Sequence, residues 1–211
     1  TTTAQGTVHV AGVGGDTYAD VYLSNDTSGH TGSDGANIFL NNSLELGVWN
    51  KELGPIRFAT NGSERLRINS HGGFQFNNAE LVERCKIVSG KLSANTNINL
   101  ADGMVYYFTT QEDTTSTPNI RVDSSNTLNA AMDAGDVITV TLVTTAAAAG
   151  YSANLTIDSV AVTEEWVGGS APSAGSSDGL DIYTYTIICT HATNTGDSGF
   201  KVIANLTNAT N

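Results

Sequence analysis

Residues 55–70 read Pro-Ile-Arg-Phe-Ala-Thr-Asn-Gly-Ser-Glu-Arg-Leu-Arg-Ile-Asn-Ser. Asn61-Gly62, in the middle of this stretch, is the strongest short-range signal for a β-hairpin. Residues 56–60 on one side and 64–69 on the other alternate between apolar and polar positions. We therefore expect two antiparallel strands with one apolar and one polar face. The alternation divides the side chains into Ile56, Phe58, Leu66 and Ile68 on the apolar face and Arg57, Arg65 and Arg67 on the polar face.

The register of this hairpin follows from keeping its apolar residues on one face. A strict two-residue loop would pair Phe58 with Arg65 and mix the faces, whereas pairing Phe58 with Leu66 needs one additional residue. The sequence therefore predicts a three-residue loop or a β-bulge. The same register puts Arg57 opposite Arg67. Because like charges destabilise a cross-strand pair, we expect both arginines to reach acceptors outside the hairpin.

An isolated hairpin is at best marginally stable, so its apolar face needs a cover. The candidate assembly face therefore consists of Ile56, Phe58, Leu66 and Ile68. Its cover would come from another part of this chain or from another copy of the chain.

The hairpin also carries a resemblance to a known family. Residues 58–73, F-A-T-N-G-S-E-R-L-R-I-N-S-H-G-G, resemble the element F-x-T-N-G-x-E-R-M-R-I-D-S-x-G of bacteriophage tail fibres and related virion proteins. Leu66 stands at the usual Met, Asn69 stands at the usual Asp, and Phe74-Gln-Phe76 replaces the customary G-I-G-T continuation. In those fibres the element commonly sits in a trimeric, β-rich shaft or knob. The resemblance implies a homotrimeric structural protein of a virion and leaves open which appendage it forms.

Three segments are expected along the 211 residues, and the expected fold class is all-β. Residues 1–17 are interpreted as an extended or flexible segment, and residues 18–79, with five or six short strands, as a small β-rich fibre or oligomerisation unit. A unit of that size rarely has a sufficient core of its own, so oligomerisation is the expected means of stabilising it. Residues 80–211 are long enough to fold alone, and their strands between Gly-rich turns favour a β-sandwich or jelly roll.

The second region shows strand-like patterning separated by turns. The expected runs are 81–89, 103–110, 119–123, 136–145, 151–158, 160–166, 182–190 and 200–206. One helical turn is expected at 127–134, with Ser124, Ser125 or Asn126 as cap and Gly135 as stop. Residues 147–158 and 164–172 give this region a resemblance to C-terminal modules of structural proteins from marine phages, especially cyanophages. That resemblance implies a place in the virion and no mechanism.

Charge and cysteine content narrow the range of partners. The net charge of −12 repels nucleic acid and anionic membranes, so we expect no nucleic-acid partner. No transmembrane run or signal peptide is recognisable, so no membrane insertion is expected. Cys85 and Cys189 lie far apart in apolar runs and are expected to be buried free thiols.

The sequence shows no arrangement typical of a catalytic or metal site. The four histidines, none at metal-ligand spacing from another, are His9, His30, His71 and His191. Glu112-Asp113 is expected to be a solvated pair in a turn, and Glu164-Glu165 to point to opposite faces of a strand. Asp178 and Asp181 are too few ligands for calcium. We therefore expect no catalytic, metal-binding or cofactor-binding residues.

Aromatic residues offer one candidate contact with a ligand. Trp166 lies at an expected strand end just before Gly168-Gly169, and it is the candidate exposed loop contact for a sugar ring. The tyrosines of the strands are expected in the core instead: Tyr106, Tyr107, Tyr151, Tyr183 and Tyr185.

These observations favour a non-enzymatic virion protein, a trimeric tail fibre that attaches to the host surface. It would assemble in the host cytoplasm and function in the virion. Its expected partners are its own copies, other virion proteins and a host glycan or receptor. The alternative is a head fibre or capsid decoration protein with a role in assembly and stability. A fibre-borne polysaccharide depolymerase is disfavoured, because it needs a pair of facing carboxylates.

Overall fold

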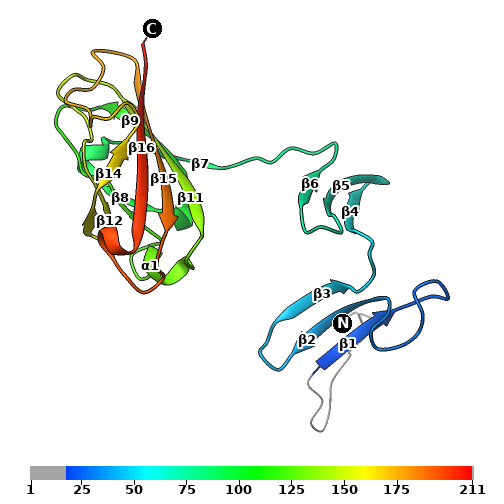
Figure 1. Cartoon of the computed structure of the whole chain (residues 1–211). Helices are drawn as coiled ribbons and strands as arrows, with labels where there is room; N and C mark the ends of the chain where they lie inside the picture. Colours follow the sequence, from blue (N-terminus) through cyan, green and yellow to red (C-terminus); the bar gives the residue numbers. More distant parts are fainter. Residues whose placement is uncertain (1–17, 211) are drawn as a thin grey trace, which may run out of the picture. The chain divides into compact units, whose positions relative to one another are not determined.

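The structure, a computed structural model, describes residues 18–210. These residues form sixteen strands, one short α-helix and three 3-10 helices (Figure 1). The prediction of an all-β fold is confirmed, although the pattern analysis expected fewer strands. The chain divides into an N-terminal unit that ends at Leu81 and a C-terminal unit that begins at Val82, two residues beyond the expected boundary. The segment expected at residues 1–17 lies outside the described residues.

The N-terminal unit contains two antiparallel sheets of three strands each. One sheet comprises β1 (Tyr18–Leu23), β2 (Ala36–Asn41) and β3 (Leu46–Asn50), and the other β4 (Ile56–Thr60), β5 (Ser63–Ile68) and β6 (Phe74–Phe76). The six strands match the five or six short strands expected for this region. Each strand is short, and none exceeds six residues.

The β4–β5 hairpin has the predicted register and reaches it with a bulge. Asn61 and Gly62 have φ angles of 50° and 71°, as a type I′ two-residue loop requires. Phe58 pairs with Leu66, and the register then shifts, so that Arg65 is the additional residue. Of the two alternatives left open by the sequence, the hairpin therefore uses the β-bulge and not the longer loop.

The polar face of this hairpin contains its own counter-charge for the two facing arginines. Arg57 does pair with Arg67 across the strands. Both guanidinium groups contact the Glu64 carboxylate, with Nε to carboxylate oxygen distances of 3.5 Å for Arg57 and 2.5 Å for Arg67. Asn77 donates a further hydrogen bond to Glu64 over 2.5 Å. The expectation that the arginines reach acceptors outside the hairpin is therefore wrong, because a carboxylate three residues before Arg67 lies within reach of both.

The first sheet is built around a single buried aromatic ring. Phe39 on β2 lies over Gly47 on β3, where an added Cβ would come within 2.1 Å of the Phe39 ring. Tyr18 and Trp49 contact the same ring edge to face, with centroid distances of 5.2 and 4.8 Å. Glycine at position 47 is thus required for the close approach of this ring to the backbone.

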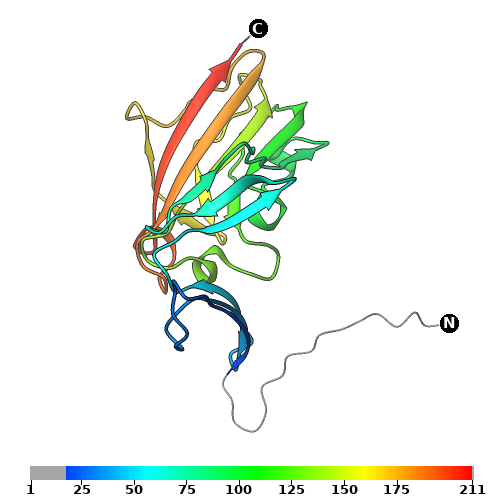
Figure 2. The same ribbon diagram turned by 90° about the vertical axis from the view of Figure 1, so that its right-hand side faces the viewer.

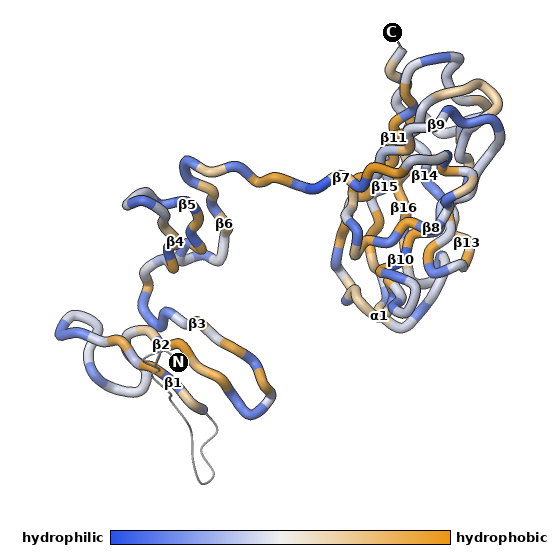
Figure 3. Tube along the Cα trace, turned by 180° about the vertical axis from the view of Figure 1, so that it is seen from behind, coloured by the Kyte–Doolittle hydropathy of each residue, from blue (hydrophilic) through white to orange (hydrophobic). Residues whose placement is uncertain are grey.

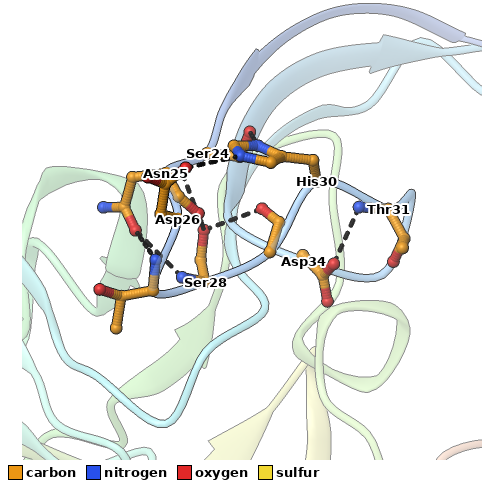
Figure 4. Close-up of polar contacts among 9 residues, drawn as sticks. Ser24, Asn25, Asp26, Ser28, His30, Thr31 and Asp34 are labelled. Carbon is orange, nitrogen blue, oxygen red and sulfur yellow. Dashed lines mark hydrogen bonds and ion pairs between the residues drawn. The ribbon is translucent and has the colours of Figure 1, made fainter.

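The loop between β1 and β2 is held by its own polar side chains (Figure 4). The Asn25 side-chain oxygen accepts hydrogen bonds from the backbone of Thr27 and Ser28, and Asp34 accepts one from the Thr31 backbone. The Nε2 atom of His30 lies 3.2 Å from the Oδ1 atom of Asp26. These polar side chains are therefore paired within the loop. No group of three or more His, Cys, Asp or Glu side chains that could hold a metal occurs among residues 18–210.

The C-terminal unit contains a six-stranded and a four-stranded sheet that share one core. The sheet orders are β14-β16-β15-β11-β9-β7 and β13-β12-β10-β8. The strands are β7 (Cys85–Val88), β8 (Asn97–Asn99), β9 (Val105–Gln111), β10 (Asn119–Arg121), β11 (Val137–Thr145), β12 (Leu155–Ile157), β13 (Val160–Val162), β14 (Glu164–Trp166), β15 (Leu180–Cys189) and β16 (Phe200–Ala209). Figure 2 shows the long strands β15 and β16 side by side.

The core between these sheets takes apolar residues from nearly every strand of the unit. β8, β10 and β12 of the smaller sheet supply Ile98, Ile120, Leu155 and Ile157, and the larger sheet supplies Phe108, Leu142, Tyr183, Tyr185 and Val202. Strand β11, which matches the run expected at 136–145, lies between β9 and β15 and is a central strand of its sheet. Tyr106, Tyr183 and Tyr185 are buried, as expected, whereas Tyr107 and Tyr151 are half-buried.

Two features of strand order were not predicted. Five strand pairs are parallel, namely β7–β9, β8–β10, β9–β11, β10–β12 and β14–β16. The single run expected at 160–166 forms β13 in one sheet and β14 in the other, and Thr163 lies at the crossing. The Asp197 carboxylate accepts hydrogen bonds from the Thr163 backbone and hydroxyl at 2.6 and 2.7 Å, which fixes the crossing point.

The helical turn is shorter than expected and has a different cap. Helix α1 spans Leu128–Ala131, and the Thr127 hydroxyl accepts a hydrogen bond from the Ala130 backbone. The three residues expected as caps precede this position, and the helix ends before Gly135. Asp158, in the turn between β12 and β13, accepts hydrogen bonds from the first two backbone N–H groups of the helix at 2.8 and 3.0 Å.

Glu112 and Cys85 differ from their expected exposure, and Asp181, one of the two acids considered for calcium, lies within strand β15. Glu112 is buried, not solvated, and its carboxylate accepts hydrogen bonds from the backbone of Leu92 and Ser93. Asp181 is fully buried and is held by Ser176 and by Asn208. Cys189 is buried as expected, whereas Cys85 is exposed because it lies on β7, the edge strand of its sheet. The three additional 3-10 helices are η1 (Leu92–Ala94), η2 (Leu100–Asp102) and η3 (Gly196–Ser198).

Candidate assembly surface

The hairpin presents the apolar face that the sequence predicts. Ile56 pairs with Ile68 and Phe58 with Leu66, so these four side chains share one side of β4 and β5. None of them is buried, and Phe58 is 48% exposed. Their grouping is confirmed, and their role in assembly stays a prediction.

Strand β6 extends this face, which the sequence analysis did not anticipate. Phe74 pairs with Ile68 and Phe76 pairs with Leu66, so both phenylalanines fall on the same side as the four hairpin residues. Phe74 and Phe76 are exposed. The signal lies in the alternation of Phe74-Gln-Phe76, which places both phenylalanines on one side of a strand. We call the six residues Ile56, Phe58, Leu66, Ile68, Phe74 and Phe76 the hairpin face.

The first sheet carries a second apolar face, which the sequence analysis missed. The register places Val21, Ile38 and Val48 opposite one another, and next to them Ala19, Leu40 and Leu46. Leu23 and Ala36 continue the same side. We call the eight residues the first-sheet face; its valines, leucines and isoleucine are all exposed. Figure 3 shows hydrophobic stretches along the strands of this sheet. Finding it from sequence requires the pairing of three strands, because each strand alone contributes only two or three apolar positions.

The N-terminal unit therefore leaves most of its apolar side chains uncovered. Phe39 is the only buried hydrophobic residue in its described part, whereas the C-terminal unit buries twenty. Burial of one large apolar side chain is worth about 1.5–3 kcal/mol. Two extended faces of this kind are unusual for a surface exposed to water and are typical of interaction surfaces.

The back of the hairpin face has the opposite character. The hydrogen bond from Arg67, aided by one from Asn77 and by the charges of Arg67 and Arg57, lowers the pKa of Glu64 below its usual range. Arg65, displaced by the bulge, donates hydrogen bonds to the Thr60 hydroxyl and to the Asn78 carbonyl. Glu64 and its partners Arg57, Arg67 and Asn77 thus form a polar network on the side opposite the hairpin face.

Trp166 occupies a different position from the one expected. It ends strand β14, as predicted, but its indole ring is half-buried and packs against the core of the C-terminal unit. Its ring contacts Tyr185 edge to face at a centroid distance of 6.4 Å. The expectation of an exposed loop residue is therefore wrong, because the strand position turns this side chain toward the core. Glu164 is half-buried and Glu165 is exposed, so the two carboxylates alternate across the strand as predicted.

The remaining chemical candidates stand apart from one another. His30 and His191 lie in polar loops, His71 lies in the turn before β6, and His9 falls outside the described residues. In the described part of the chain, no helix is long and apolar enough to cross a membrane. Comparison of the chain with protein-family models, with curated proteins and with solved structures gives no match.

Proposed function

We propose that this chain is a non-enzymatic structural protein of a bacteriophage virion, a homotrimeric tail fibre that attaches to the host surface. The N-terminal unit assembles three copies through the hairpin face and the first-sheet face. The C-terminal unit, a β-sandwich, is presented outward. The virion and the number three come from the resemblance of residues 58–73 to fibre elements.

The observation that carries this proposal is a contrast between the two units. The N-terminal unit exposes its apolar faces, whereas the C-terminal unit buries its apolar side chains in a core of its own. The C-terminal unit has its own buried core, so it needs no cover from the N-terminal unit to fold. A β-rich unit as small as the N-terminal one rarely has a sufficient core of its own, and Phe39 alone is buried in its described part. Copies of the same chain are the favoured cover, because both faces are apolar and offer no charge for a different partner to recognise.

Assembly also gives the C-terminal unit a functional advantage. Three copies of one weak binding site, held together, bind a surface far more tightly than one copy does. Attachment to a host surface that repeats the same chemical group profits from this gain. The other virion proteins that anchor the fibre would contact the remaining parts of the N-terminal unit.

The experiment that tests the proposal is the mass of the chain in solution. We expect light scattering after size exclusion to give a trimer for residues 1–211 and a monomer for residues 82–211. A monomeric whole chain, or a trimeric C-terminal piece, contradicts assembly through the N-terminal unit.

The second candidate function is a head fibre or capsid decoration protein that stabilises the particle. The same exposed apolar faces favour it if they meet other virion proteins in place of copies. Antibody labelling of intact particles separates the two functions. We expect label at the tail, and label spread over the head would replace the first proposal by the second.

A further inference from the structure

Unpaired polar atoms gather at one edge of the C-terminal unit. Among the described residues, four buried side-chain nitrogen or oxygen atoms have no hydrogen-bond partner. Three of them belong to β14 and its surroundings: Glu164 Oε1, Trp166 Nε1 and the Tyr185 hydroxyl. Buried polar groups without partners are rare in folded proteins, and each calls for an explanation. The three atoms lie beneath the surface around one edge strand, β14, and are closed off from solvent.

Two hollows meet at the same strand. One, of about 330 Å³, is lined in part by Asn154, Glu164 and Trp166, and the other, of about 270 Å³, by Trp166 and Asn208. Trp166 and Ser170 line both hollows. Together they have the size of a small-molecule site, which typically begins at about 300 Å³.

The loop that borders these hollows is tied to the sheets at several points. The Val167 backbone donates to the Ala204 carbonyl on β16, and the Gly175 backbone donates to the Ala148 carbonyl in the loop after β11. Gly168 and Gly169 have φ angles of 91° and 85°, which only glycine adopts without strain, and they turn the chain sharply after Trp166. The hollows are therefore formed in the free chain and do not depend on a closing movement.

The chemistry of the lining selects one class of ligand. An indole ring offers a flat apolar surface, and the amide, hydroxyl and carboxylate groups of Asn154, Ser170 and Glu164 donate and accept hydrogen bonds. A sugar ring has one apolar face and a rim of hydroxyl groups, which matches this combination. Two carboxylates in the lining, Glu164 and Glu165, repel an acidic sugar, and the nearby Lys201 already lies 3.8 Å from Glu165.

We propose that the two hollows that share Trp166 bind a neutral saccharide, with the indole ring packed against a sugar ring and Glu164 and Asn154 bonded to its hydroxyl groups. This inference rests on the proposed function, because attachment to the host surface supplies the glycan.

The test uses the fluorescence of Trp166 in the full chain. Trp49→Phe leaves Trp166 as the only tryptophan, because the chain contains two. The probes are neutral trisaccharides of glucose, mannose and galactose, and trigalacturonate as the acidic counterpart. We expect a saturable change of emission with at least one neutral trisaccharide and none with trigalacturonate. No saturable change with any neutral probe, or equal binding of the acidic probe, overturns the proposal.

A matched pair of variants locates the binding in the hollows. Ser170→Tyr fills the space shared by both hollows from an exposed loop position, and we expect it to weaken binding at least tenfold. Ser173→Tyr adds the same ring to an exposed position of the same loop that lines neither hollow, and binding should stay unchanged. Equal losses in the two variants place the sugar elsewhere and overturn the proposal.

Light scattering on the same samples separates this inference from the proposed function. A trimer that gives no fluorescence change with neutral sugars refutes the saccharide site and leaves the fibre standing. A monomer that binds a neutral sugar in the Ser170-dependent manner refutes the trimeric fibre and leaves the site standing.

Discussion

The N-terminal and C-terminal units are built from strands with the same alternation of apolar and polar residues, yet they end in opposite states. In the C-terminal unit the apolar sides of two sheets face each other and bury twenty hydrophobic residues. In the described part of the N-terminal unit the apolar sides of two small sheets stay exposed around a single buried phenylalanine. Alternation therefore tells which residues share a side of a sheet, and only the partner of that side tells whether the residues form a core or an interface.

The largest effect is expected from a charge placed on the hairpin face. Phe58→Asp puts three carboxylates into the proposed trimer interface and removes about 1.5–3 kcal/mol of burial in each copy. We expect a monomer in light scattering, with the thermal unfolding of the C-terminal unit unchanged. Leu53→Asp is the matched control, since Leu53 is 95% exposed and lies outside the two apolar faces. A Phe58→Asp variant that remains trimeric excludes this face as the interface.

A core substitution in the C-terminal unit should destabilise that unit and leave the trimer intact. Leu142→Ala removes a fully buried side chain from the central strand β11, and we expect a loss of about 2–5 kcal/mol in the free energy of unfolding of this unit. The trimer should persist at temperatures below that transition. Val137→Ala on the exposed part of the same strand should change the free energy by less than about 0.5 kcal/mol. Equal losses of unfolding free energy for the two variants in chemical denaturation would mean that β11 is not a central strand of the core.

The Glu64 network offers a smaller effect that depends on pH. Because contacts with Arg67, Asn77 and Arg57 lower the pKa of Glu64 in the folded state, its contribution to stability is present above the pKa of the unfolded chain. That contribution is lost as the pH falls through the lower, folded value. We expect Glu64→Gln to weaken the trimer at pH 7, where it leaves Arg57 facing Arg67 without a counter-charge.

Trimer dissociation followed between pH 7 and pH 3 checks this expectation. The difference in trimer dissociation between the wild-type chain and Glu64→Gln should become smaller as the pH falls toward 3, because Glu64 then becomes protonated in the wild-type chain. Glu45→Gln provides the control, because Glu45 precedes β3 and lies outside the hairpin network. A difference that stays constant over the whole range shows that the charge of Glu64 has no part in it.

The sequence predicted the relations within a strand pair better than the relations between layers. The register of Phe58 with Leu66, the bulge and the facing arginines follow from alternation and turn chemistry alone. Glu64 as the acceptor of those arginines does not, because it depends on where the bulge turns each side chain. The first-sheet face likewise depends on the joint register of three strands.

The same reasoning explains the misplaced residues of the C-terminal unit. Cys85 lies in an apolar run that forms an edge strand, and sequence patterning does not distinguish an edge from a centre. Glu112 can be buried because the N–H groups of residues 92 and 93, 20 and 19 positions earlier in the chain, donate hydrogen bonds to its carboxylate. Trp166 turns inward because the chain changes sheets at Thr163, a crossing that depends on a distant carboxylate, Asp197.

The smallest effect concerns Glu164, a half-buried carboxylate at the proposed saccharide site that lowers the stability of the C-terminal unit at neutral pH. Burial, with a smaller effect of the Asp197 charge, raises the pKa of Glu164, so the folded chain holds this proton more tightly than the unfolded chain does. The raised pKa of Glu164 therefore stabilises the folded unit against unfolding at pH values below the pKa of this residue in the unfolded chain. This stabilisation is lost as the pH rises through the pKa of Glu164 in the folded chain. Glu164→Gln removes this pH dependence of stability, because glutamine carries no charge at either pH. We therefore expect the variant to melt at a modestly higher temperature than the wild-type chain at pH 7 and at no higher temperature at pH 4.

Glu165→Gln, on the exposed face of the same strand, should show no such gain and serves as the control. A gain at pH 7 together with weaker sugar binding would mean that Glu164 is kept for its ligand and not for the fold, as at other sites where function opposes stability. A loss of stability at pH 7 would instead make the carboxylate a structural element of the β14 edge. That edge would then resemble the Glu64 side of the hairpin, where charge serves to order the strands.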